Sequence, residues 1–431
     1  MSKEENRKNF SKYVSQNILG MIGFSCYVLA DSYFISIAKG ADGLTALNLV
    51  MPLYSIIFSI GEMIGVGSAI RYAISKIKKD ADADDYFWNA IIWCIMSSMI
   101  FVFAGIFFSA DIMRVLGADE HIVAVGNNYT KIFMCFAPMF MCNYVTNAFV
   151  RNDGAPGIAM SATLFSSLFN IVFDYILMFP MNLGMEGAAL ATALSPIIGM
   201  GICSIHFFSK KSSVRLVVCK PSVRKLVAGC QLGVSAFVGE MSSAVITLAF
   251  NFVILKLTGN VGVAAYGVVA NIAIVTTAVF NGVAQGSQPL ISSCFGRGDK
   301  DGCTQLKRMG YTTAFVLAAV MYSILFIFAG QFVAVFNSEG SEMLRLYATE
   351  GVKLYFIGIF FAGINIVGGG AFSATEDAFK AAVVSVARGF VLILGAVFVM
   401  SALFGMTGVW LAYAVAEGIT TFIMLVMVLR V

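Results

Sequence analysis

The chain has 431 residues, of which 59% are hydrophobic and only 12% are charged. Soluble domains contain roughly 45–50% apolar and about 25% charged residues, so ordinary soluble cores cannot bury this much apolar sequence. The mean hydropathy of +0.86 points the same way. The composition therefore predicts a polytopic helical membrane protein that is embedded in the lipid bilayer.

Charge and chemistry-bearing residues exclude several other classes. The net charge of +4, from 28 basic and 24 acidic residues, is too small to indicate nucleic-acid binding. The nine cysteines form no Cys-x-x-Cys pair, and two histidines are too few for a transition-metal cluster. No phosphate-binding loop of the Gly-x-x-x-x-Gly-Lys-Ser/Thr type occurs, so ATP is not the direct energy source. We expect neither an enzyme nor a resident cofactor.

Twelve stretches are long and apolar enough to cross a bilayer, which requires roughly 20 residues each. The polar start Met1–Lys12 is followed by an apolar stretch that contains Asp31, unlike a cleavable signal peptide. We therefore expect the first span to be retained. The predicted spans are residues 14–37, 46–70, 87–110, 127–149, 158–180, 188–208, 227–256, 262–290, 309–332, 350–371, 379–402 and 408–429.

The basic residues predict how these spans are oriented. With the N-terminus in the cytoplasm, the cytoplasmic segments, which include 209–226 and Arg430, carry 21 Lys and Arg residues and the outer segments carry six. This asymmetry predicts a multi-pass protein of the cell membrane with both termini in the cytoplasm. Arg388 lies inside span 11, near its inner end, and we expect its side chain to snorkel to the interface.

The two halves of the sequence resemble each other. Gly43–Ala46 aligns with Gly262–Ala265 at an offset of 219, and Gly184–Gly187 aligns with Gly405–Gly408. Because an even number of spans is duplicated, both copies have the same orientation. Parallel repeats related by an axis along the membrane normal are typical of transporters that rock two lobes around a central site.

The repeat predicts the fold class and the domain organisation. We expect an all-α polytopic membrane protein with twelve transmembrane helices in two six-helix lobes, related by a pseudo-two-fold axis along the membrane normal. The basic segment between the halves is the natural linker between the lobes. The predicted units are the first lobe (1–208), a cytoplasmic linker (209–226) and the second lobe (227–431).

Polar residues at membrane depth suggest a cation site in the first lobe. An ionisable residue inside a span costs on the order of 2.5–3.5 kcal/mol on insertion scales and is a functional candidate. Four residues share one layer in the outer half: Asp31 in span 1, Asn170 and Asp174 one turn apart in span 5, and Thr192 in span 6. Their oxygens suit Na⁺ or a proton, and two close carboxylates resist ionising together. We predict a cation-coupling and candidate Na⁺ site; a structural hydrogen-bonded cluster is the alternative.

A second set of polar residues is a candidate for substrate binding. Glu240 lies in the middle of span 7, where an anion suits an organic cation, although it could instead bond a nearby serine. Glu62 in span 2 either lines an inner vestibule or pairs with a basic residue. Asn281 and Gln285 make a polar face on span 8 that either lines the cavity or joins helices.

The order and spacing of these features resemble the multidrug and toxic compound extrusion (MATE) family. The resemblance covers nearly the whole chain. It implies cation-driven efflux of amphipathic, often cationic compounds through a V-shaped pair of lobes. The residues that carry it are Asp31, the Arg151–Pro156 loop, Asn170-x-x-x-Asp174, the segment from Gly184 to Thr192, Gly286-Ser287-Gln288-Pro289 and Phe295-Gly296-Arg297-Gly298-Asp299.

The resemblance also implies where coupling takes place. In one branch of the family, a span 1 Asp, a span 5 Asn and Asp, and a span 6 Thr carry coupling, and they match Asp31, Asn170, Asp174 and Thr192. Other members place coupling acids in the second lobe. Glu240 matches their span 7 acid, but span 10 offers Asn365 where an acid is expected. This departure favours the first-lobe site.

The leading hypothesis is a monomeric antiporter, coupled to H⁺ or Na⁺, that exports amphipathic organic cations by alternating access. A flippase-like carrier of lipid-linked compounds or metabolites is the alternative, although the mainly acidic intramembrane charges favour cationic cargo. Segment 71–86 lacks the Gly-Asp-Arg-Arg type loop of major-facilitator carriers. A channel or a receptor is a further class: channel flux would not follow an opposing ion gradient, and a receptor would bind without net flux.

Overall fold

The computed structural model describes residues 3–215, 217–336 and 341–429, and every regular element in these ranges is helical. Arg430 lies outside the described residues. The elements are α1 (Lys3–Lys78), α2 (Asp85–Val115), α3 (Glu120–Cys135), α4 (Ala137–Asn152), α5 (Pro156–Met178), α6 (Gly184–Phe207), α7 (Val223–Gly296), α8 (Lys300–Ile327), α9 (Ala329–Phe336), α10 (Glu342–Tyr355), η1 (Phe356–Gly358), α11 (Ile359–Ala374), α12 (Ala378–Val386), η2 (Ala387–Val391) and α13 (Leu392–Leu429).

The described helices provide twelve membrane crossings, as predicted. Nine helical segments are long and apolar enough to span a bilayer, and the α3–α4 pair, bent by 46°, makes ten. As one straight helix the 74 residues of α7 would extend about 110 Å, far beyond the roughly 30 Å hydrocarbon core. Gly259 breaks α7 and Gly405 breaks α13 with positive φ angles of 67° and 59°, so each of these apolar segments is a hairpin of two spans.

Several predicted spans are not single regular helices. Span 127–149 is α3 followed by α4, with a break at Phe136. Pro138 lies in the first turn of α4, where its missing N–H is tolerated, and it cannot continue the ladder of α3. Span 309–332 ends α8 at residue 327 and continues as α9, and span 379–402 contains the π-helical turn η2. These corrections leave the number of crossings unchanged.

The internal repeat is visible in the turns as well as in the sequence. Gly40 and Gly259, which break α1 and α7, have φ of 59° and 67°. Lys79 and Gly298, at the turns that follow these hairpins, have φ of 60° and 73°. The members of each pair are related by the same offset that aligned the two halves of the sequence. The same backbone conformation therefore recurs at equivalent positions of the repeat.

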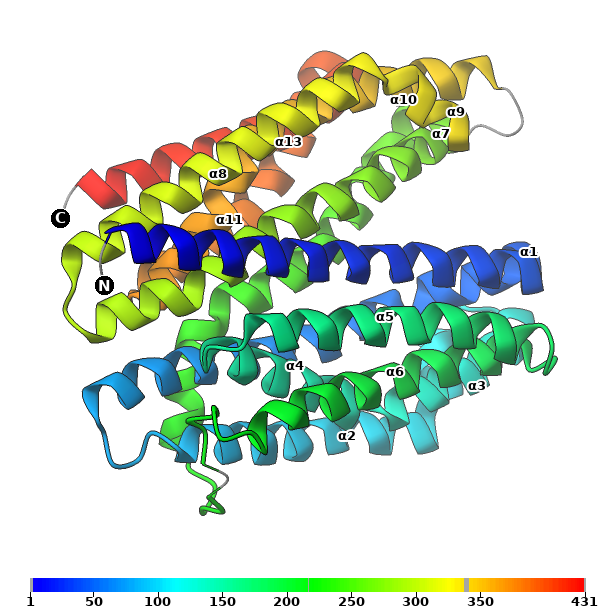
Figure 1. The fold of residues 1–431 in the computed structure, drawn as a ribbon. Coiled ribbons are helices and arrows are strands. Elements are labelled where there is room, and N and C mark those ends of the chain that lie inside the picture. Colours follow the sequence, from blue (N-terminus) through cyan, green and yellow to red (C-terminus); the bar gives the residue numbers. More distant parts are fainter. Residues whose placement is uncertain (1–2, 216, 337–340, 430–431) are drawn as a thin grey trace.

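The helices form two groups that diverge from one end of the bundle (Figure 1). We call the helices α1–α6 the first lobe and the helices α7–α13 the second lobe. The described chain begins and ends on the same side of the bundle, which we call the basal end. At the opposite, distal end the two lobes are separated, which gives a V-shaped pair of lobes. The breaks of α1 at Gly40 and of α7 at Gly259 each lie one span away from the basal end.

The lobes make backbone contact in the basal half, at a seam that we define by Gly67 and Gly286. A Cβ atom on Gly67 of α1 would lie 2.0 Å from the carbonyl oxygen of Gly229 in α7. A Cβ atom on Gly286 of α7 would lie 2.8 Å from the Cα of Val14 in α1. Because Gly67 and Gly286 are related by the repeat offset as well, the seam itself obeys the repeat. Glycine at these positions permits the close approach that closes the basal end.

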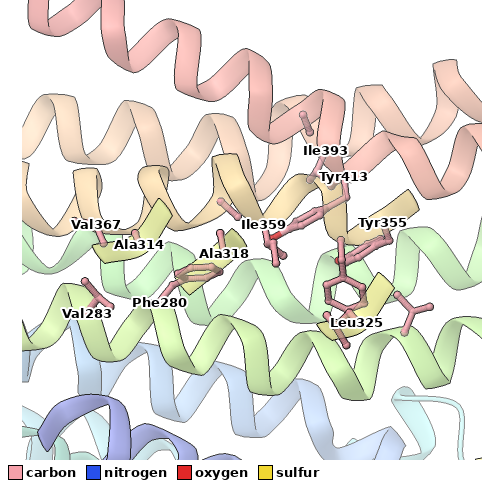
Figure 2. Close-up of a cluster of buried hydrophobic side chains, with 14 of the residues drawn as sticks. Phe280, Val283, Ala314, Ala318, Leu325, Tyr355, Ile359, Val367, Ile393 and Tyr413 are labelled. Atoms are coloured by element: carbon pink, nitrogen blue, oxygen red, sulfur yellow. The ribbon is translucent and has the colours of Figure 1, made fainter. Parts of the chain in front are cut away.

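The core of the second lobe packs aromatic and branched side chains between helices (Figure 2). Phe280 comes from α7, and Tyr355 and Tyr413, from α10 and α13, stack with ring centroids 4.4 Å apart. By contrast, large apolar side chains such as Ile100 and Phe107 of α2 are exposed on the outside of the bundle. This inside-out distribution is what a lipid-facing surface requires.

Candidate functional site

The structure brings the four predicted first-lobe residues together. Asp31 comes from α1, Asn170 and Asp174 from consecutive turns of α5, and Thr192 from α6. All four side chains are buried, and Asp31 is the most exposed of them at 6%. The four-residue spacing on α5 puts the amide and the carboxylate on one face of the helix. Three helices of the first lobe therefore meet at this layer.

A hydrogen-bonded chain runs through this layer. In the amide orientation that satisfies both neighbours, Asn170 Nδ2 donates to Asp174 Oδ2 at 3.1 Å. The Asn170 amide oxygen then accepts from the hydroxyl and the backbone N–H of Thr192, at 3.2 and 3.3 Å. These contacts fix one oxygen of Asp174. They leave the second carboxylate oxygen free to take a proton or a cation.

Two buried oxygens in the layer have no hydrogen-bond partner in the described part of the chain. They are Asp31 Oδ1 and Asp174 Oδ1, one on each carboxylate. The two carboxylates are also close enough to interact electrostatically. Buried charged oxygens without partners are costly, and like charges add to that cost, so a proton or a cation would stabilise this arrangement.

The donor set of the layer fits a hard cation. Carboxylate, amide and hydroxyl oxygens are its ligands, and oxygen ligands suit hard cations better than soft transition metals. Among the described residues, no group of three or more His, Cys, Asp or Glu side chains is arranged to hold a metal ion. The layer therefore offers oxygen ligands from two carboxylates, one amide and one hydroxyl group.

Sequence reasoning missed the tyrosines that adjoin the layer. Tyr54 of α1 and Tyr129 of α3 share a hydrogen bond between their hydroxyl groups, and both interact electrostatically with Asp31 and Asp174. The Tyr54 ring also stacks on Phe133, with centroids 3.6 Å apart. A tyrosine inside a span is itself a signal, because its buried hydroxyl needs a polar partner.

A large cavity lies between the lobes. It is open to solvent and is bounded mostly by first-lobe helices, with second-lobe residues closing one side. A second cavity, also open to solvent, adjoins it on the second-lobe side. The four predicted substrate-binding residues line both cavities: Glu62, Glu240, Asn281 and Gln285.

Glu62 is linked to a basic residue through a side chain of the other lobe. Gln285 Nε2 donates to Glu62 Oε1 at 3.2 Å, and Arg151 Nη1 donates to Gln285 Oε1 at 2.7 Å. Arg151, at the end of α4, is buried rather than exposed in a loop. The amide of Gln285 therefore connects an acid and a base of the first lobe and ties both to the second lobe.

Glu240 has a different environment. Among the described residues it forms no ion pair and no hydrogen bond, and it lines both cavities. The serines that were its alternative partners, Ser242 and Ser243, donate instead to the backbone carbonyl of Gly239, at 2.9 and 3.4 Å. The alternative of a serine partner is therefore wrong, and Glu240 lines the cavities as the substrate-binding prediction requires.

The expectation that Arg388 snorkels was also wrong. Its guanidinium pairs with the buried carboxylate of Glu417 in α13, with Nη2 2.7 Å from Oε1. Asn365 Nδ2 donates to the other carboxylate oxygen at 2.7 Å. Glu417 is a fifth acid inside the spans, and sequence reasoning missed it. The signal was present: one acid in span 12 and one base in span 11, each too costly to leave alone in lipid.

The loop between α4 and α5 is fastened by one buried carboxylate. Asp153 accepts hydrogen bonds from His206 of α6 at 2.7 Å, from Tyr72 of α1 at 3.1 Å and from Ser212 at 3.1 Å. Ser212 belongs to the predicted linker 209–226. The carboxylate therefore ties the start of that segment to the basal end of the first lobe.

Twelve apolar crossings in two related lobes, with a polar cavity between them, define a polytopic membrane carrier. The sequence pattern of the MatE family matches residues 17–176 and 236–399, so the chain belongs to the MatE family. It is therefore a multi-pass membrane transporter and not an enzyme, which agrees with the resemblance seen in the sequence.

Named relatives extend this similarity over nearly the full chain. The chain is 27% identical over 414 residues to multidrug export protein MepA of Staphylococcus aureus strain MRSA252, covering 93% of this chain and 89% of the relative. It is 26% identical over 410 residues to the protein of the same name from Staphylococcus saprophyticus, again covering 93% and 89%.

Solved structures share the fold. One is described as the outward-facing conformation of a multidrug resistance MATE family transporter of the MOP superfamily. It superposes with a TM-score of 0.92 at 20% identity, covering 99% of this chain and 96% of that one. A MOP superfamily transporter from Pyrococcus furiosus, whose binding pocket is described as having reverse polarity, gives a TM-score of 0.90 at 19% identity, covering 98% and 95%. At these identities the likeness concerns the fold.

Proposed function

We propose that the protein is a multidrug antiporter that exports amphipathic organic cations in exchange for H⁺ or Na⁺ by alternating access. The single observation that carries the proposal is the first-lobe layer, in which Asp31 and Asp174 each bury a carboxylate oxygen without a partner. The central cavity, with the unpaired carboxylate of Glu240, gives an organic cation a place to bind. The names of the curated relatives as multidrug export proteins support the same activity.

The layer supplies a physical basis for coupling. Binding a proton or a cation removes the cost of two buried, like-charged carboxylates, so an occupied layer stabilises the arrangement that holds it. Transport is coupled when the occupied layer favours one orientation of the lobes and the empty layer favours the other. The ion and the substrate then affect each other's binding by the same factor.

The arrangement of the lobes supports an outward-facing state. The seam at Gly67 and Gly286 closes the basal end, while the lobes diverge at the distal end (Figure 1). With the predicted topology, the basal end faces the cytoplasm and the distal end faces outside. Asp31 lies about two helical turns below the distal break at Gly40, so an ion from outside reaches it by a short path.

A transport assay with imposed gradients tests the proposal. Proteoliposomes are loaded with a fluorescent organic cation, and its efflux is measured under a pH gradient and, separately, under a Na⁺ gradient. The wild-type protein should respond to at least one gradient, and the response identifies the ion. The Asp31→Asn variant should lose that response, because an amide can neither take the proton nor offer a charged ligand.

Asp111→Asn is the matched control. Asp111 is an exposed acid near the distal end of α2 that pairs with Arg114 at 2.7 Å. Its loss should leave gradient-driven efflux unchanged. Wild-type coupling in Asp31→Asn would overturn the assignment of the layer, whereas an absence of gradient-driven efflux in the wild-type protein would overturn the antiport itself.

A further inference from the structure

The first helix is longer than a membrane crossing requires. From Lys3 to its break at Gly40, α1 runs for 38 residues. A helix of this length extends about 57 Å, whereas the hydrocarbon core is roughly 30 Å thick. Because the predicted span covers residues 14–37, most of the excess lies at the basal end. Residues 3–12, which we call the basal segment, therefore cross the headgroup layer as a helix.

One face of the basal segment is docked on the second lobe. Asn6 is buried, and its Nδ2 donates to Oε1 of Gln305 in α8 at 3.3 Å. Gln305 Nε2 donates in turn to the backbone carbonyl of Lys3 at 3.0 Å. One turn further along α1, Phe10 is buried in the hydrophobic core of the second lobe, and so is Val14. The basal segment of this first-lobe helix therefore lies against the second lobe, beside α8 (Figure 1).

The opposite face of the basal segment is basic. Arg7, Lys8 and Lys12 are all exposed. With 3.6 residues per turn, Lys8 and Lys12 project away from the buried stripe that contains Asn6 and Phe10. Within the described ranges, no carboxylate forms an ion pair with any of the three cations. The two acids of the segment precede them, in the first turn of α1.

The depth of these cations matches that of lipid phosphates. At 1.5 Å per residue, Lys12 lies about 3 Å and Lys8 about 9 Å beyond the predicted end of the span at residue 14. The headgroup layer occupies roughly 5–8 Å on each side of the hydrocarbon core, so both long side chains reach it. Clusters of Lys and Arg directly beside a transmembrane helix attract anionic lipids. The basal segment therefore presents its cations where an anionic headgroup lies.

The basic face is specific to the first repeat. The offset of 219 between the two halves places its three cations opposite Leu226, Val227 and Gln231 at the start of α7. The cation that α7 carries beside them, Lys225, pairs with Asp85 of the first lobe. The duplicated fold therefore does not require a basic face at this position. The cations of α1 remain open to a ligand from outside the chain.

We propose that the basal segment binds anionic phospholipid headgroups and that the bound lipid holds the basal ends of the two lobes together. The lipid phosphates contact Arg7, Lys8 and Lys12, while the opposite face stays docked on α8. Lipid favours the closed basal end because only the docked segment presents all three cations together at headgroup depth. The lipid binding is independent of transport, and its effect on the lobes rests on the proposed alternating access.

Thermal unfolding in mixed micelles tests the lipid binding. The protein is unfolded in detergent with added phosphatidylglycerol, which is anionic, with phosphatidylcholine, which is zwitterionic, and with inorganic phosphate. A ligand that binds the folded protein raises its melting temperature, so phosphatidylglycerol should raise it most. In Arg7→Gln/Lys8→Gln/Lys12→Gln, the phosphatidylglycerol concentration that gives half of the rise should increase on the order of a hundredfold, since each basic residue near an anionic surface contributes about fivefold in binding.

Lys210→Gln/Lys211→Gln/Lys220→Gln is the matched control. These three lysines are exposed in segment 209–226, so the control removes the same charge from the predicted cytoplasmic side and should respond to phosphatidylglycerol as the wild-type protein does. Each triple variant removes three of the 21 basic residues on that side, which keeps the asymmetry that orients the spans. In phosphatidylcholine both variants should melt with the wild-type protein, because the exchanged side chains are exposed.

Distances between spin labels on the basal ends of the two lobes test the effect on the lobes. In phosphatidylglycerol bilayers the basal ends of the wild-type protein should stay close. In phosphatidylcholine bilayers, and in the basal-segment variant in either lipid, the population with separated basal ends should rise by roughly fivefold or more. The control variant should follow the wild-type protein in both lipids.

Equal stabilisation of the wild-type protein by the two lipids would overturn the lipid site. The same holds for a basal-segment variant that keeps the full response, and for a control variant that loses as much of it. Inorganic phosphate that stabilises as well as phosphatidylglycerol would show a site for a free anion instead of a lipid. Label distances that are the same in both lipids would overturn the effect on the lobes. None of these measurements uses efflux, so a failure of the proposed antiport is distinguished from a failure of the lipid site.

Discussion

Each lobe buries a polar layer at membrane depth, and the two layers differ in one respect. Both contain acid, amide and hydroxyl groups, but only the second contains its own cation. In the first lobe, two carboxylates each retain an oxygen without a partner. In the second lobe, Arg388 and Asn365 saturate the Glu417 carboxylate. The first layer therefore leaves carboxylate oxygens free for a proton or a cation, whereas the second pairs its acid with a base of its own lobe.

The second layer did not arise by copying the first. The offset of 221 that relates Gly184 to Gly405 places Glu417 opposite Pro196 of α6, which is a neutral position. The duplicated scaffold therefore kept its turns and its basal seam while its buried charges changed. The comparison supports the proposal that the first lobe responds to an ion gradient, and each of the following predictions tests that proposal.

Breaking the ion pair of the second lobe should have the largest effect. Arg388→Met leaves Glu417 buried without its partner, which should lower the free energy of unfolding by about 3–5 kcal/mol. The double variant Arg388→Met/Glu417→Gln should recover most of that loss, because no unpaired charge remains. Thermal unfolding in detergent, followed by intrinsic fluorescence, measures both. A single variant as stable as the wild-type protein would show that Glu417 does not depend on Arg388.

Neutralising the first layer should change coupling instead of stability. Asp174→Asn removes one of two like charges, so the melting temperature should stay the same or rise. The ratio of substrate efflux with and without the ion gradient should fall by roughly 5–150-fold, the usual range of a coupling free energy. Glu186→Gln, at an exposed acid at the distal end of α6, is the control. Destabilisation comparable to that of Arg388→Met would make the two layers alike and contradict the comparison.

Alanine substitutions at the basal seam should destabilise the contact between the lobes from either side. Gly67→Ala and Gly286→Ala both place a Cβ atom against backbone, and overpacking of this kind costs typically about 1–3 kcal/mol. Each variant should therefore favour separation of the basal ends, with the larger effect at Gly67. Distances between spin labels on the two lobes measure the shift.

Gly201→Ala is the matched control for the seam. Gly201 lies in α6 with no other group within 4 Å of an added Cβ, so alanine should stabilise the helix by roughly 0.5–1 kcal/mol and leave the lobes unmoved. A seam variant with wild-type label distances would show that glycine is not needed there.

The exposed ion pairs His121–Asp42 and Arg345–Glu342 should have the smallest effects on stability. The hydrogen bond that His121 donates to Asp42 raises the pKa of His121 above its ordinary 6.5, so the pair stabilises the fold below that pH and loses its effect as the pH rises through the raised pKa. In the second lobe, Arg345 lowers the pKa of Glu342 below 4.5, and that effect is lost on acidification. Both pairs are exposed and screened by solvent.

The pH dependence of the melting temperature tests the predicted effect of these two ion pairs. Asp42→Asn should follow the wild-type curve closely, with any loss confined to the acidic side. A large difference above the raised pKa of His121 would contradict the sign of the argument, because the neutral imidazole no longer forms an ion pair there.

Much of the fold could be predicted because hydrophobic length, basic loops and an even repeat are local properties of the sequence. The depth of each polar residue follows from its place in a span, which is why four residues on three helices could be assigned to one layer from their positions alone. Their meeting is now observed, and their role in coupling stays a prediction. The division at 208 and 227 into lobes and linker stays a prediction as well.

What could not be predicted depends on which helix faces which. Depth alone does not say that Arg388 turns toward Glu417, because the π-helical turn changes the face that the arginine presents. The bond between Tyr54 and Tyr129 likewise joins helices that are distant in sequence. The break at Phe136 depends on a competition between Pro138 and a long apolar run, which periodicity does not resolve.

The most direct test of the account is whether a substrate gradient drives the ion. Proteoliposomes are given a gradient of the organic cation and no ion gradient, and the movement of H⁺ and of Na⁺ is recorded. The wild-type protein should move one of these ions in the direction opposite to the substrate, because coupling is reciprocal. Asp31→Asn and Asp174→Asn should move neither, while Arg388→Gln/Glu417→Gln should move the ion as the wild-type protein does. Ion movement that survives in both first-lobe variants, or that is lost only in the second-lobe variant, would contradict the account.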